Sequence, residues 1–169
     1  MKIIGLWAML LVLLYSLQTS LLTYVNFDGF SANLMLLLTV SVAYLRGHKV
    51  GAFFGFMAGL LQDLTTGSYF GLAIFSYMTV GLVFGKFSVN LFREQSLLPV
   101  ISSVPALALH FAITIMFLFM LGQYVDFIHF VRSDFWFLAI IQLVLAYPVH
   151  KLVTALNDFS KQRRRGNFL

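Results

Sequence analysis

The chain has 169 residues, of which 60% are hydrophobic and only 10% are charged. A soluble globular domain has about 45–50% apolar and about 25% charged residues, so this composition excludes a soluble protein and predicts an integral membrane protein. The lack of cysteine excludes disulfides and thiol chemistry, and we assign the formal charge of +5 to membrane topology rather than to nucleic-acid binding.

Six apolar segments approach the length of a membrane-spanning helix, which needs about 20 residues to cross about 30 Å of hydrocarbon. They cover residues 3–22, 30–45, 50–66, 70–89, 97–121 and 135–156. The first segment is expected to be an uncleaved helix, because the cleavage-site pattern that follows it is weak. The second and third are short and are joined by residues 46–49 alone, which predicts a tight helical hairpin, with a re-entrant pair as the alternative.

The basic residues predict the orientation of these six spans. Placing the N-terminus inside puts ten of the eleven on the cytoplasmic side, namely Lys2, Arg46, Lys49, Lys86, Arg93, Lys151, Lys161, Arg163, Arg164 and Arg165. Only Arg132 then lies outside. Because translocation of Lys and Arg is disfavoured, both chain ends are expected in the cytoplasm.

The domain organisation follows from the same segments. Residues 1–160 are expected to form a single polytopic membrane domain, and residues 161–169 a basic cytoplasmic tail. In that tail Lys161, Arg163, Arg164 and Arg165 are expected to meet the anionic headgroups of the lipid bilayer. The longest outer loop, residues 122–134, is rich in aromatic residues and is expected to lie along the membrane interface.

Glycines recur every four residues on the predicted third helix, at Gly51, Gly55 and Gly59. This spacing places them in one stripe, where a second backbone can approach closely. We expect a helix-packing or partner interface along the stripe. The pattern does not decide whether the facing helix belongs to this chain or to a partner.

Asp63 continues the stripe by one further step of four residues. An ionised carboxylate inside a membrane is costly and marks a candidate functional site. Its place near the outer end of the helix favours a structural role, in which Asp63 with Thr65, Thr66 and Ser68 bonds free backbone groups and caps the fourth helix.

Other residues that carry chemistry are scattered. His48, His110, His129 and His150 fall in different segments, so no metal site is expected. His110 lies deep in the fifth segment, where we expect a hydrogen bond to a neighbouring helix. Pro105 and Pro148 are expected to kink the fifth and sixth helices. The sequence has no phosphate-binding loop and no hydrolase or metalloprotease motif, so we expect neither an enzyme nor a cofactor.

The stretch from residue 51 to residue 72 resembles the MreD family of rod shape-determining proteins, whose pattern is a Gly-rich helix, then G-x-x-x-D-L, a Ser/Thr-Gly turn and a further Gly-Leu. The residues that supply it here are Gly59, Asp63, Leu64, Gly67, Ser68, Gly71 and Leu72. Residues 31–37 are similar to the family's second helix, although Ala32 stands where a proline is usual.

The resemblance implies a non-catalytic scaffold in the bacterial cytoplasmic membrane, within the complex that elongates the cell by peptidoglycan synthesis. The implied partners are the single-span protein MreC, the complex's synthase and transpeptidase, and, indirectly, MreB. The implied fold is similar to the six-helix substrate-binding subunits of energy-coupling-factor transporters. A vitamin-binding subunit is therefore the alternative function, although the A-x-x-x-A docking patch of those subunits is missing from residues 6–12.

The predicted topology can be measured with reporter fusions. Fusions after Arg46, Arg93 and Arg163 should report a cytoplasmic location, and fusions after Phe27 and His129 an external one, because of the distribution of basic residues. An external signal at Arg93 would contradict six spans, since it requires an odd number of preceding crossings.

Overall fold

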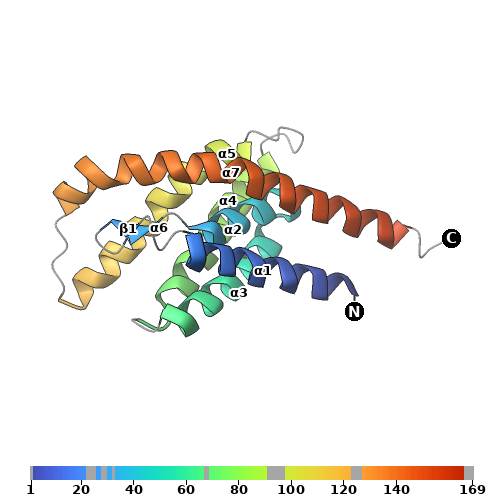
Figure 1. Cartoon of the computed structure of the whole chain (residues 1–169), viewed down its shortest axis with the longest axis horizontal. Helices are drawn as coiled ribbons and strands as arrows, with labels where there is room; N and C mark the ends of the chain where they lie inside the picture. Colours follow the sequence, from blue (N-terminus) through green and yellow to red (C-terminus); the bar gives the residue numbers. More distant parts are fainter. Residues whose placement is uncertain are drawn as a thin grey trace.

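The chain folds as an assembly of helices with one short pair of strands (Figure 1). The computed structural model describes residues 2–21, 26–27, 30–31, 33–66, 69–90, 98–122 and 127–165, with the side chains of residues 5–20, 33–65, 69–88, 98–122 and 135–160. The helices are α1 (Lys2–Leu21), α2 (Leu34–Arg46), α3 (His48–Thr66), α4 (Leu72–Asn90), α5 (Leu98–Ile101), α6 (Ser103–Met120) and α7 (Phe127–Arg165). The strands β1 (Asn26–Phe27) and β2 (Phe30–Ser31) pair in antiparallel fashion. The predicted helical class is confirmed.

The second predicted segment begins later than expected. Phe30 and Ser31 belong to β2, and helix α2 begins at Leu34. The cause is Asn33, whose extended backbone and side-chain acceptor for the Leu36 N–H make it the N-cap. At the other end Gly47, with φ of 85°, donates its N–H to the Ala43 carbonyl and ends the helix. The predicted connection of residues 46–49 therefore shrinks to Gly47, because α3 already begins at His48.

The fifth predicted segment is two helices, α5 and α6, separated at Ser102. Pro105 lies in the first turn of α6, where the first four N–H groups have no intrahelical partner and a missing donor is tolerated. The discontinuity is therefore at Ser102, and not a kink at Pro105. Pro148 does lie inside a helix, α7, as expected.

Helix α7 is much longer than the sixth predicted segment. It runs for 39 residues, or about 58 Å at 1.5 Å per residue. The predicted interfacial loop of residues 122–134 is wrong in its second half, because residues 127–134 are helical. Residues 127–165 contain one proline, Pro148, and no glycine, so the sequence has no helix-ending signal near residue 156. The predicted tail begins inside this helix, since Lys161, Arg163, Arg164 and Arg165 all belong to α7.

Helix α2 is the centre of the assembly. All residues from 34 to 44 are buried, and the helix contacts α1, α3, α4, α5, α6 and α7. A helix surrounded on every side needs no polar face, and residues 34–45 of α2 are accordingly apolar except for Thr39, Ser41 and the Tyr44 hydroxyl. Thr39 uses its hydroxyl to bond the Met35 carbonyl within the same helix.

The outer surface of the assembly is apolar. On α6 and α7, which extend to the left of the other helices in Figure 1, large side chains such as Met116, Phe119 and Trp136 are 64–73% exposed. Two helical segments, Leu98–Met120 and Phe135–Ser160, are long and apolar enough to cross a membrane, and α1, α2 and α4 contain shorter apolar helices. Apolar side chains outside and amides inside suit lipid as the surrounding solvent.

The glycine stripe on α3 faces α4 of the same chain, and Gly51 also faces Ala43 of α2, whose Cα lies 2.7 Å from a Cβ added at Gly51. A Cβ added at Gly55 would lie 2.7 Å from the Tyr77 carbonyl carbon, and one added at Gly59 would lie 2.5 Å from Ile74 Cα. The contact is reciprocal, because a Cβ at Gly81 on α4 would lie 2.6 Å from the carbonyl carbon of Gly51. The two backbones touch directly, so neither has room for a side chain along this line.

Gly55→Leu should therefore separate α3 from α4 and lower the thermal stability and membrane abundance of the protein. Overpacking of this kind costs about 1–3 kcal/mol or more, and here the obstacle is backbone that cannot change rotamer. The matched control is Phe53→Leu, two positions away, where the side chain is 58% exposed. Equal melting temperatures and abundances for the two variants would contradict the interface.

Candidate functional site

The start of α2 is the most concentrated polar site among the described residues. The first backbone N–H groups of any helix lack intrahelical partners, and here that end is buried. Asn33 Oδ1 accepts from the Leu36 N–H at 3.1 Å, and Gln18 Oε1 of α1 accepts from the Met35 N–H at 3.1 Å. Side chains from two elements thus satisfy donors that lipid could not.

A glutamine of α7 completes the site. Gln142 is fully buried, and its Oε1 accepts from the Asn33 backbone N–H at 2.9 Å while its Nε2 donates to the Asn33 carbonyl at 3.2 Å. The Asn33 side-chain amide donates to the hydroxyl of Tyr77 on α4. Gln18 extends the network by donating to Gln62 of α3 at 3.0 Å. One buried point therefore ties α2 to α1, α3, α4 and α7.

The chemistry of this cluster suits a structural role, in which its side chains hold helices together. Its side chains are amides and one phenol, with no carboxylate, thiol or imidazole among them. Each of the polar contacts described above joins one part of the chain to another. Within the described residues no group of three His, Cys, Asp or Glu side chains could hold a metal ion.

Asp63 caps α4, as the sequence suggested. The residue is 6% exposed, and its two carboxylate oxygens accept from the backbone N–H groups of Gly71 at 2.9 Å, Ala73 at 3.1 Å and Ile74 at 3.1 Å. These are the free donors at the start of α4, where the helix dipole also favours a negative charge. The carboxylate of α3 thereby holds the next helix at its first turn.

The remaining glycines of the predicted interface have different positions. Gly71 has φ of 101°, a conformation that side-chain-bearing residues rarely adopt, and it begins the turn into α4. Gly67 lies outside the described residues, as do the side chains of Thr66 and Ser68. Thr65, which was expected to bond the turn, instead donates to the Leu61 carbonyl within its own helix. The side chains of Lys161, Arg163, Arg164 and Arg165 also lie outside the described part.

Two histidines have partners inside the described part of the assembly. His110 Nδ1 lies 2.6 Å from the Ser76 hydroxyl of α4, which confirms the expected bond to a neighbouring helix. His150 is 7% exposed and contacts Thr154 of its own helix, which donates to the His150 carbonyl at 2.8 Å. The backbone of His129 belongs to α7 rather than to a loop.

A second polar cluster surrounds the last residue of α2. The Arg46 guanidinium donates from Nε to Asn157 Oδ1 at 2.8 Å and from Nη2 to Ser160 Oγ at 3.2 Å, both on α7. Its central carbon lies 4.4 Å from the centre of the Trp7 ring on α1, a cation–π contact. Arg46 thus fastens α1 and α7 to the far end of α2.

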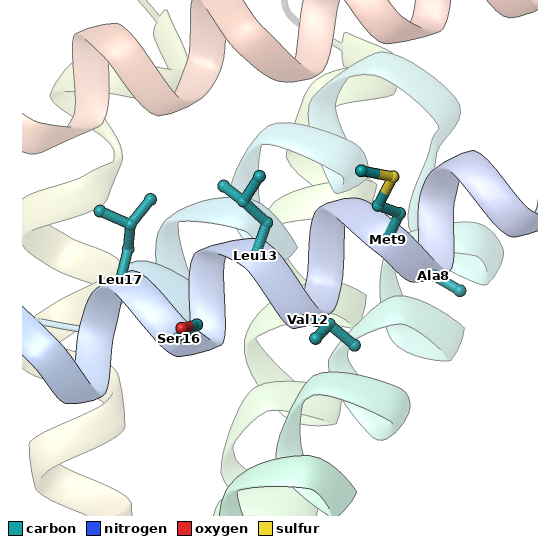
Figure 2. A pocket seen from close by; sticks show the side chains of 6 residues that line it. All are labelled: Ala8, Met9, Val12, Leu13, Ser16 and Leu17. Carbon is teal, nitrogen blue, oxygen red and sulfur yellow. The ribbon is translucent and has the colours of Figure 1, made fainter.

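The outward face of α1 carries a shallow depression (Figure 2). The residues that line it are Ala8, Met9, Val12, Leu13, Ser16 and Leu17. All six are exposed, whereas the buried face of α1 presents Trp7, Leu10, Leu14 and Gln18 to the core. The depression therefore faces away from α2 and from both polar clusters.

The two polar clusters that join the helices were not predicted from the sequence. Gln18, Asn33, Gln142 and Arg46 were not singled out as site residues, although each is a polar residue within or next to an apolar segment. That position is the available signal, because a polar group in lipid requires a partner. Which residue partners which was not readable, since Asn33 and Gln142 are 109 positions apart.

Asp63→Ala should lower the thermal stability of the detergent-solubilised protein more than Asp63→Asn does. Alanine leaves three N–H groups without an acceptor, whereas asparagine keeps one oxygen and loses the charge that favours the helix N-terminus. The expected loss for alanine is about 1–3 kcal/mol. Two variants as stable as the wild type would show that the cap is dispensable.

The family of the chain can be stated from a comparison with known families. A family model described as rod shape-determining protein MreD matches residues 1–156, which include α1 to α6 and most of α7. No curated protein and no solved structure matches the chain. The resemblance seen in the glycine-rich stretch and its Asp-Leu is confirmed by this match. The chain belongs to the MreD family of membrane proteins, which have a role in rod shape determination.

Proposed function

We propose that the chain is a non-catalytic scaffold of the complex that elongates rod-shaped bacteria by peptidoglycan synthesis, and that it binds MreC. The observation that carries the proposal is the family match over residues 1–156. The proposed wider partners are the synthase and transpeptidase of the complex and, indirectly, MreB.

The arrangement of polar groups supports a scaffold rather than an enzyme. Five buried or half-buried polar side chains each form a hydrogen bond to another part of the chain. They are the amides of Gln18, Asn33 and Gln142, the carboxylate of Asp63 and the imidazole of His110. Groups engaged in this way hold helices at fixed positions. A rigid helical body is what a membrane scaffold needs, since it must present the same surface to each partner.

The proposed topology is six crossings of the bacterial cytoplasmic membrane with both termini in the cytoplasm. Five crossings are supplied by α1, α3, α4, α5 together with α6, and α7, with lengths of about 28–58 Å at 1.5 Å per residue. The sixth, α2, is about 20 Å long and is shielded from lipid by the surrounding helices. Its polar starting end then lies at membrane depth, where amides of neighbouring helices replace water. The proposed membrane domain is residues 1–160, with residues 161–169 as the basic tail.

The proposal predicts that MreC co-purifies with this chain. The full chain, tagged at its C-terminus, would be expressed with MreC in a rod-shaped host lacking its own MreD, and then purified in mild detergent. We expect MreC to be recovered and rod shape to be restored, because both depend on the same scaffold. An unrelated single-span membrane protein, expressed at the same level, is the control and should be absent.

The same purification tests the alternative function. Recovery of an energy-coupling ATPase or a bound vitamin, with no MreC and no restoration of shape, would contradict the scaffold and support a vitamin-binding subunit. Recovery of MreC without restored shape would contradict the elongation role while leaving the interaction in place.

A further inference from the structure

The Arg46 cluster contains more hydrogen-bond donors than the described residues satisfy. Trp7 is 5% exposed, and no side chain or backbone group of the described residues bonds its indole Nε1. Asn157 is 1% exposed, and its Nδ2 also has no partner within the described part of the chain, although its Oδ1 accepts from Arg46. Both side chains contact the guanidinium of Arg46, so the two donors belong to one cluster.

Buried donors of this kind require an acceptor. An indole N–H can only donate, and an amide NH₂ offers two donors. A water molecule would bring two further donors into a cluster that already carries a positive charge. A group with several oxygen acceptors and a negative charge complements the cluster better, and phosphate is the group whose geometry matches a guanidinium.

The position of the cluster indicates where such a phosphate comes from. Arg46 is the last residue of α2, and Trp7 lies near the start of α1. The apolar part of α2 ends at this cluster, and the exposed Lys49 follows at the beginning of α3. Arginine, lysine and tryptophan at the ends of membrane helices lie at the depth of lipid headgroups, and basic pockets between such helices bind anionic headgroups.

We propose that Trp7, Arg46 and Asn157 bind the phosphate group of an anionic phospholipid. Arg46 supplies the charge, while Trp7 Nε1 and Asn157 Nδ2 donate to phosphate oxygens. The bound lipid joins α1, α2 and α7 at the end of α2 opposite the amide cluster. The site requires a membrane but does not depend on MreC binding.

The test uses the full-length protein after removal of lipid in detergent. Thermal unfolding would be measured with added phosphatidylglycerol, phosphatidylcholine or inorganic phosphate, and retained lipid would be counted by native mass spectrometry. We expect phosphatidylglycerol alone to raise the melting temperature and to remain bound. Equal stabilisation by inorganic phosphate would overturn a lipid site in favour of free phosphate, and equal stabilisation by phosphatidylcholine would overturn selectivity for an anionic lipid.

Variants separate this site from a purely structural cluster. Asn157→Asp keeps an acceptor for Arg46 and should fold, but it removes the donor and adds a negative charge, so phosphatidylglycerol affinity should fall about tenfold or more. Trp7→Phe keeps the ring contact and loses only the N–H, so affinity should fall by a smaller factor. Lys49→Gln, at an exposed cation outside the cluster, is the matched control and should behave as wild type.

Two further results, both from the variants, would overturn the proposal. One is a folded Asn157→Asp protein that phosphatidylglycerol stabilises as strongly as wild type. The other is an equal loss of affinity in Lys49→Gln and Asn157→Asp, which would reduce the effect to general attraction between a basic protein and an anionic surface. If Asn157→Asp fails to fold, Trp7→Phe decides, since unchanged affinity in that variant contradicts a donated indole bond.

Discussion

A helix that begins inside an apolar assembly must find partners for its first backbone N–H groups, and this requirement governs the architecture of the protein. Helix α2 is surrounded by all the other helices, so water cannot satisfy that end. Asn33 and Gln18 supply the acceptors, and Gln142 bonds both backbone groups of Asn33. The positions of α1, α4 and α7 therefore depend on hydrogen bonds at the start of α2, and not on apolar packing alone.

The other helix–helix interfaces are stabilised by interactions other than buried amides. Lipid is as apolar as leucine, so apolar burial gives little reason for two membrane helices to associate. Helices α3 and α4 solve this by direct backbone contact along Gly55 and Gly81, and by the bonds from Asp63 to the first turn of α4. At the far end of α2, Arg46 holds α1 and α7 through stacking and two hydrogen bonds. Backbone packing and capping thus join α3 to α4, and the charged Arg46 joins α2 to α1 and α7.

The sequence predicted what depends on local pattern. The apolar segments correspond to helices, the four-residue repeat of Gly51, Gly55 and Gly59 lies against another helix, and Asp63 caps the helix that follows it. Each of these follows from residues within about two turns of one another. The family resemblance rested on the same short stretch, which is why it could be recognised before the structure.

What depends on distant pairs was not predictable. The partners of Asn33 and Gln18 lie 109 and 44 positions away, and no periodicity connects them. The long α7 was also missed, because the end of an apolar pattern marks where a helix leaves the core and not where its backbone stops being helical. Glycine and proline are the common signals that end a helix, and the sequence has neither between Pro148 and Gly166.

The central claim is that the amide cluster at the start of α2 determines how the helices assemble, and Gln142→Met tests it most directly. Methionine has a similar volume but cannot bond Asn33, so the buried Asn33 N–H loses its acceptor and the Asn33 carbonyl keeps only the bond from the Leu37 N–H. The measurement is the unfolding free energy in detergent, with the exposed Leu143→Met as the control at the next position. The account predicts a loss of about 1–3 kcal/mol for Gln142→Met and little change for Leu143→Met. Equal stability of Gln142→Met and the wild type would contradict it.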